Sequence, residues 1–269
     1  MDMHKPSSLR DYVIAILIAT ALTVFLGFYL FIRRGFMLDA PAGVDPLYVP
    51  NKVIANAGMI ILAFTFLIGS IVRYFDRFDT WLGYRKEIGV VGAFLALSHG
   101  TISYFYLPQS NPNEYIDFTS LEFGAGLLGA LLLFFLFIIS FKKAIDLIGA
   151  SRWWFLQRWG LRLVIAFTLV HIYALKWNGW VKWLTHGAVP SKELVAPWLP
   201  GASLLATLFI TWVVIVRLYE SIFVFKNFGL STKEISMDTI LKARGRRFFI
   251  GSFWTLIILY VFVITRWMW

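Results

Sequence analysis

The feature that most limits how this chain can fold is a set of seven apolar runs. Each is about as long as a helix needs to cross the hydrocarbon core of a bilayer. They lie near residues 12–32, 53–73, 88–107, 119–141, 158–176, 203–224 and 248–268. Hydrophobic residues make up 59% of the 269 residues, more apolar surface than one soluble core would bury. We therefore expect an all-α integral membrane protein, a bundle of about seven transmembrane helices.

The positions of lysine and arginine between these runs predict the orientation of the bundle. Basic residues are concentrated before the first run, between the second and third, between the fourth and fifth, and between the sixth and seventh. By the positive-inside rule these segments are cytoplasmic, so the amino terminus lies inside and the carboxyl terminus outside. Arg33 and Arg34 run against this bias. The net charge of +10 is explained by membrane orientation, and no nucleic-acid partner is expected.

The connecting segments contain no second domain, so we treat residues 1–269 as a single transmembrane domain. Residues 107–118 are typical of a turn-rich outer loop. Residues 177–202 are rich in tryptophan and proline, which predicts an outer loop lying on the membrane surface. Residues 225–247 end in "KARGRR", which favours contact with anionic lipid head groups.

The chain has no cysteine. This excludes disulfides, thiolate-bound iron–sulfur clusters and covalently attached c-type haem. Any redox cofactor must therefore be held by other side chains.

Two of the four histidines, His99 and His171, lie inside apolar runs, where ligating residues are costly and are functional candidates. Counted from the inner ends of the third and fifth runs, they lie roughly 17 Å and 20 Å along their helices. Two imidazoles at matched depth on different helices are what a six-coordinate haem iron needs. The alternative is that each is a hydrogen-bonded packing residue. His186 is predicted in the outer loop, as a solvated residue or a partner of a haem propionate.

Small residues and arginines surround these histidines in the sequence. Gly92 and Ala96 share a helix face with His99, where they could give clearance to a porphyrin or allow close helix packing. Arg85 and Arg158 stand at the inner ends of the two histidine helices, with Arg162 one turn further along. They either pair with acidic groups of a cofactor or electron donor, or anchor the helices at head-group level.

Two segments carry a resemblance to a known family. The stretches "YRKEIGVVGAFLALSHGTISYF" and "SFKKAIDLIGASRWWFLQRWGLRLVIAFTLVHIYAL" resemble the third helix and the fourth-to-fifth helix junction of the ferric-reductase-like transmembrane domain. Stand-alone members of similar size are the MsrQ/YedZ-like haem b membrane subunits, and NADPH oxidases and ferric reductases share the domain. The resemblance covers residues 50–225 as the ferric-reductase-like core, and it implies a six-helix core followed by one extra helix. Residues 225–269 then form a basic inner segment and an additional C-terminal helix.

The resemblance also implies b-type haem, with His99 and His171 as axial ligands of the iron, and transmembrane electron transfer. Members with two stacked haems have a second histidine pair lower on the same helices, where this chain has Lys86 and Gln157. We therefore expect one haem. How electrons would reach this haem across the inner half of the membrane is left open. The alternatives are FMN near the arginines, a quinone, a second haem with unusual ligation, and a donor and acceptor that both act from outside.

The function that we predict is electron transfer by a haem b membrane protein, as a component of an oxidoreductase in a bacterial inner membrane. Electrons would come from a cytosolic flavin reductase or a quinol and pass to an outer-face redox protein. The alternative is a structural or assembly subunit of a larger membrane complex. A transporter is less favoured because the runs show no cluster of buried carboxylates and no pair of broken helices.

Overall fold

The computed structural model describes residues 9–75, 78–107, 119–224 and 232–268, with the side chains of 232–238 left aside. Within these ranges the regular structure is helical and contains no strand. The helices are α1 (Leu9–Arg34), α2 (Tyr48–Phe75), α3 (Asp79–Thr101), α5 (Leu121–Ile139), α6 (Lys142–Ile148), α7 (Ala150–His186), α8 (Ala202–Tyr219) and α9 (Thr232–Thr265). Two π-helical turns, η1 (Ile102–Tyr106) and η2 (Glu220–Val224), continue α3 and α8.

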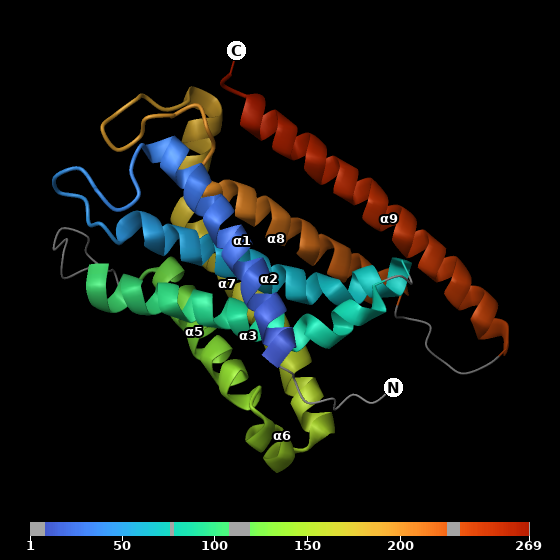
Figure 1. The fold of residues 1–269 in the computed structure, drawn as a ribbon. Coiled ribbons are helices and arrows are strands. Elements are labelled where there is room, and N and C mark those ends of the chain that lie inside the picture. The colour runs from blue at the N-terminus through green and yellow to red at the C-terminus, as the bar shows by residue number, and fades with distance from the viewer. Residues whose placement is uncertain (1–8, 76–77, 108–118, 225–231, 269) are drawn as a thin grey trace.

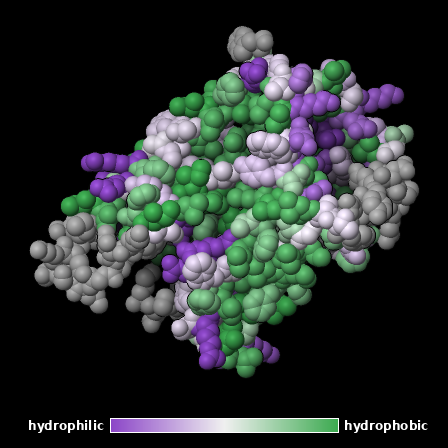
Figure 2. Space-filling view, turned by 180° about the vertical axis from the view of Figure 1, so that it is seen from behind, coloured by the Kyte–Doolittle hydropathy of each residue, from purple (hydrophilic) through white to green (hydrophobic). Residues whose placement is uncertain are grey.

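Seven of these helices are long and apolar enough to cross a membrane, if α3 and α8 are each counted with the π-helical turn that follows. Each overlaps one of the seven apolar runs, so the predicted fold class is confirmed, and the protein is a multi-pass membrane protein. Large apolar side chains such as Phe28 of α1, Phe134 of α5 and Ile258 of α9 are exposed. Figure 2 shows one face of the molecule made largely of hydrophobic residues, with hydrophilic residues in separate patches.

Helix α2 lies at the centre of the bundle and has the largest buried share of the seven spans. It packs against α1, α3, α8 and α9, while α5 packs mainly against α7 (Figure 1). Glycines allow the closest approaches. A Cβ at Gly58 of α2 would lie 2.8 Å from the backbone nitrogen of Ala96 in α3, so these two backbones are nearly in contact.

Helix α7 is longer than its apolar run, and the prediction of an outer loop over residues 177–202 is wrong for residues 177–186. Nothing in this stretch stops a helix until Gly187, whose φ of +73° favours glycine and ends α7. Trp183 is buried, and its indole N–H donates to the carbonyl of Pro197 at 2.9 Å. These side chains therefore pack within the protein and do not all lie in the membrane interface.

Two other segments between the apolar runs contain helix. The "KARGRR" stretch belongs to α9, because that helix begins at Thr232. The predicted outer loop over residues 107–118 lies outside the described residues except for Leu107. The short helix α6 joins α5 to α7 and ends at Gly149, which has a φ of +81°.

Candidate functional site

His99 lies near the end of α3 and is held by a side chain of α2. Its Nδ1 atom is 2.9 Å from Oδ1 of Asn51 and 3.3 Å from the hydroxyl of Ser103. The Nδ2 group of Asn51 donates to that same hydroxyl at 2.8 Å, which fixes the orientation of the carboxamide. Because Oδ1 can only accept, His99 Nδ1 carries the proton and Nε2 keeps its lone pair.

His171, in α7, is held by the main chain of α5. Its Nδ1 atom is 2.6 Å from the carbonyl oxygen of Glu122. A carbonyl only accepts, so this ring also has a protonated Nδ1 and a basic Nε2. The ring needs Gly126, because a Cβ there would lie 2.8 Å from Nδ1 and 3.1 Å from Cε1. The start of α5 is fixed by Ser120, whose hydroxyl accepts from the backbone N–H of Phe123 at 3.2 Å.

The two rings are held at the same end of the bundle. Asn51 belongs to the first turn of α2, and Glu122 to the first turn of α5. These helices are the second and fourth spans, which run in the same direction across the membrane in a simple alternating topology. The equal depth of the two rings stays a prediction.

The arrangement fits a haem better than a bare metal ion. Metal-ligating histidines usually donate their second ring N–H to an oxygen, as both do here. Among the described residues, neither Nε2 atom has a hydrogen-bonding partner, and both side chains are half-buried. A bare ion would need further ligands, and no group of three His, Cys, Asp or Glu residues in the described ranges could hold one. A haem supplies its own equatorial ligands and needs only two imidazoles.

Gly92 and Ala96, predicted to line the cofactor, lie instead at the contact between α3 and α2. A Cβ at Gly92 would be 2.8 Å from Cγ2 of Ile61, and the backbone of Ala96 faces Gly58. Helix packing, one of the two explanations that the sequence left open, therefore accounts for both small residues.

The two positions expected below the haem have different roles. Gln157 is joined to α5, since its Nε2 group donates to the carbonyl of Leu136 at 3.0 Å and to the hydroxyl of Ser140 at 2.9 Å. Lys86 is half-buried near the start of α3. The single haem stays a prediction, and the contacts of Gln157 give that residue a structural role.

Arg85 and Arg158, also predicted to bind a cofactor, both lie near Trp154. Arg158 lies with Trp154, Phe155 and Trp159 around an open depression on the surface of α7, and all four residues are exposed. The guanidinium carbon of Arg85, which comes from α3, lies 6.0 Å from the ring centroid of Trp154. That of Arg162 lies 4.6 Å from the ring of Trp159. Three arginines and three aromatic rings therefore gather around the first half of α7.

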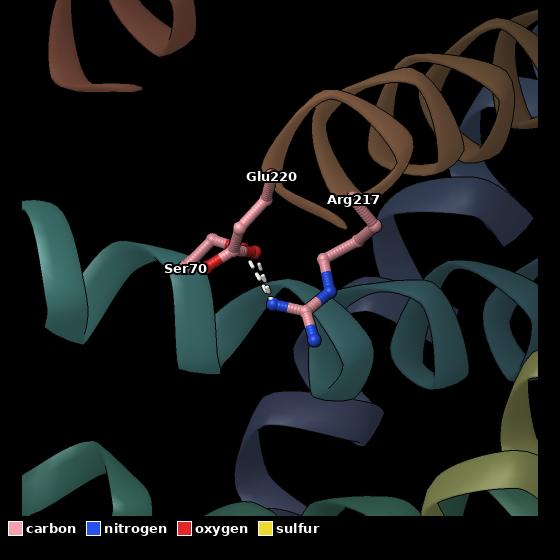
Figure 3. A network of polar contacts seen from close by, with 3 residues as sticks. All are labelled: Ser70, Arg217 and Glu220. Atoms are coloured by element: carbon pink, nitrogen blue, oxygen red, sulfur yellow. Dashed lines mark hydrogen bonds and ion pairs between the residues drawn. The ribbon is translucent and has the colours of Figure 1, made fainter. Parts of the chain in front are cut away.

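A buried ionic cluster was not predicted from the sequence. Arg217 and Glu220 pair at the end of α8, and both contact Ser70 of α2 (Figure 3). The Arg217 side chain donates to the Ser70 hydroxyl at 2.8 Å, and that hydroxyl donates to Glu220 at 2.6 Å. Only 1% of Glu220 is exposed.

A signal for this cluster exists in the sequence. Glu220 lies inside the sixth apolar run, and a carboxylate there is costly unless it is paired. Glu87 of α3 is a second buried carboxylate, and its Oε2 atom has no partner among the described residues.

For Asn51 the signal in the sequence is weaker, because this residue lies just before the second apolar run. His186 is exposed at the end of α7 and bonded to Thr185, so it belongs to neither site.

Residues 54–168 match the family model described as ferric reductase like transmembrane component. The matched segment is somewhat less than half of the chain and contains His99, while His171 lies three residues beyond its end. Among curated proteins, none matches the chain significantly.

Proposed function

Because residues 54–168 match the ferric reductase like transmembrane component family, we propose that the chain is a haem b protein that carries electrons across a membrane. Electrons enter from a cytosolic flavin reductase or a quinol and leave to a redox protein at the outer face. The observation that carries the proposal is the pair His99 and His171, with both Nδ1 atoms bonded to oxygen and both Nε2 atoms without a partner among the described residues.

The residues of the chain hold and insulate the redox group. His99 from α3 and His171 from α7 would hold the haem iron, and the haem would supply a one-electron ferric–ferrous couple. Asn51 and the Glu122 carbonyl keep the two rings in the tautomer that can ligate iron. The identity of the ligands, their hydrogen bonds and their burial set the reduction potential.

The donor would act from the inner half of the bundle, where Arg85, Arg158 and Arg162 lie beside the exposed aromatic surface of α7. Concentrated arginine favours a ligand or protein surface with negative charge, such as the phosphate of FMN. A quinol could instead use the aromatic surface. The positive-inside orientation, with a cytoplasmic amino terminus in a bacterial inner membrane, is part of the same proposal.

Spectroscopy of the purified protein tests the proposal. A reduced-minus-oxidised difference spectrum is expected to show b-type bands, with a haem-to-protein ratio near one. His99→Ala and His171→Ala are each expected to abolish the low-spin spectrum, because each removes an axial ligand.

His186→Ala is the matched control, since His186 is exposed and lies outside the site, and it is expected to keep the wild-type spectrum. A well-folded wild-type protein that is colourless after expression with ample haem would contradict the proposal. That result would favour the structural or assembly subunit. A ratio near two would instead show a second haem.

A further inference from the structure

The two candidate ligands are positioned by different kinds of group. His171 donates to a main-chain carbonyl, whereas His99 donates to the side chain of Asn51, on another helix and 48 residues away in the sequence. We propose that Asn51 is the positioning residue for His99. It would fix the ring's tautomer and orientation and so set the strength of His99 as a haem ligand. This inference rests on the proposed function.

The carboxamide of Asn51 is held in one orientation. The residue is 3% exposed and lies between Val49 and Val53, which are also buried. Its Nδ2 group is occupied by the hydroxyl of Ser103, so Oδ1 is directed at the imidazole. Ser103 lies in the π-helical turn η1, four residues after His99, and its hydroxyl closes a triangle of contacts with the ring. Such turns are frequent at functional sites.

The chemistry of this contact bears directly on ligation. A hydrogen bond from Nδ1–H to an oxygen keeps the lone pair on Nε2 and raises the basicity of the ligand. Loss of such a partner typically lowers metal affinity about 10- to 100-fold. A carboxylate in the same place would accept the proton more strongly and make the imidazole a better electron donor, which favours ferric iron.

The geometry also implies that the two ligands differ. The contact of His99 is 2.9 Å long and made to a neutral side chain, while that of His171 is 2.6 Å long and made to the main chain. His99 is therefore the ligand whose strength depends on one substitutable residue.

The test compares three variants by redox titration and by haem retention after dilution. Asn51→Leu removes the acceptor at similar volume and is expected to weaken haem retention about 10- to 100-fold and to raise the midpoint potential. Asn51→Asp is expected to retain the haem and to shift the potential the opposite way. Opposite shifts from one position would not arise from a merely structural role.

Asn56→Leu is the matched control, because Asn56 is a buried asparagine of the same helix that donates to the Lys52 carbonyl and does not contact His99. It is expected to leave the potential unchanged. If Asn51→Leu and Asn51→Asp both behave like Asn56→Leu in a haem-loaded protein, the inference is overturned while the proposed function stands.

A second measurement does not need the haem. In apoprotein labelled with ¹⁵N-histidine, the His99 resonance, identified by its loss in His99→Ala, is expected to show a protonated Nδ1. Asn51→Leu is expected to lower the population of this tautomer, because only the longer contact with the Ser103 hydroxyl, 3.3 Å, is then left. A protonated Nε2 in the wild type would overturn the inference. A wild-type protein that binds no haem at all would instead contradict the proposed function.

Discussion

Gly126 lies so close to the His171 ring that the site requires a residue without a side chain at this position, although an alanine would suit the helix. A Cβ at Gly126 would lie 2.8 Å from Nδ1 of His171, on the ring edge that donates to the Glu122 carbonyl. Gly126→Ala is therefore expected to displace the ring and to lower the fraction of low-spin haem severalfold. The absorption spectrum of the purified variant measures this.

Gly124 offers a control on the same helix, because a Cβ there meets nothing within 4 Å. Gly124→Ala is expected to leave the spectrum unchanged and to stabilise α5 by up to about 1 kcal/mol. Equal spectra for the two alanine variants would show that the close approach of Gly126 to His171 does not constrain the site.

Single functional residues can be recognised from the sequence where their polarity is unusual for their surroundings. His99 and His171 are polar groups inside apolar runs, and the cost of burying them marks them as candidates. Asn51 could not be found in this way, because its role depends on a contact between helices that no local pattern records. Gly92 has two adequate explanations in the sequence, and only its contact with Ile61 identifies the packing role.

The pair Arg217–Glu220 joins two elements, since both side chains contact Ser70 and so tie the end of α8 to α2. Glu220→Gln is expected to lower the free energy of unfolding by on the order of 3–5 kcal/mol, because it leaves the buried guanidinium without its counter-ion. Thermal unfolding in detergent measures the effect.

The double variant Arg217→Met with Glu220→Met is expected to recover much of this loss, because no buried charge is then left unpaired. A substitution at Glu193, which is exposed between α7 and α8, serves as the control. If Glu220→Gln unfolds at the wild-type temperature, the pair is not what ties α8 to α2.

The sequence predicts where the seven membrane-spanning helices lie, but it does not predict all of their ends. Apolar length identifies all seven spans, because a helix satisfies every backbone hydrogen bond within lipid. The end of α7 is not predicted, since the stretch before Gly187 is polar enough to resemble a loop, although the protein packs Trp180 and Trp183 inside. The sequence carries no periodic signal for the π-helical turns η1 and η2.

Across the molecule as a whole, α1 begins and α9 ends at opposite ends of the bundle, as Figure 1 shows and as an odd number of spans requires. The chain has no cysteine, so each introduced cysteine is unique. Ser191→Cys, after α7, is expected to react with a membrane-impermeant maleimide in intact cells. Asp146→Cys, in α6, is expected to react only after the membrane is permeabilised.

Both positions are exposed, so a difference in labelling reports the side of the membrane and not burial in the protein. The reverse pattern would invert the predicted orientation. It would also place the two histidines near the cytoplasmic face and exchange the proposed sides of donor and acceptor.

The two hydrogen bonds that the histidines donate differ in how easily a mutation can remove the acceptor. The carbonyl that accepts from His171 is present whatever amino acid occupies position 122, so no substitution of that side chain deletes the acceptor. The acceptor for His99 is the side chain of Asn51 and can be lost or replaced in one step. Related proteins could therefore vary the acceptor of His99 through position 51, while the main-chain acceptor of His171 stays the same.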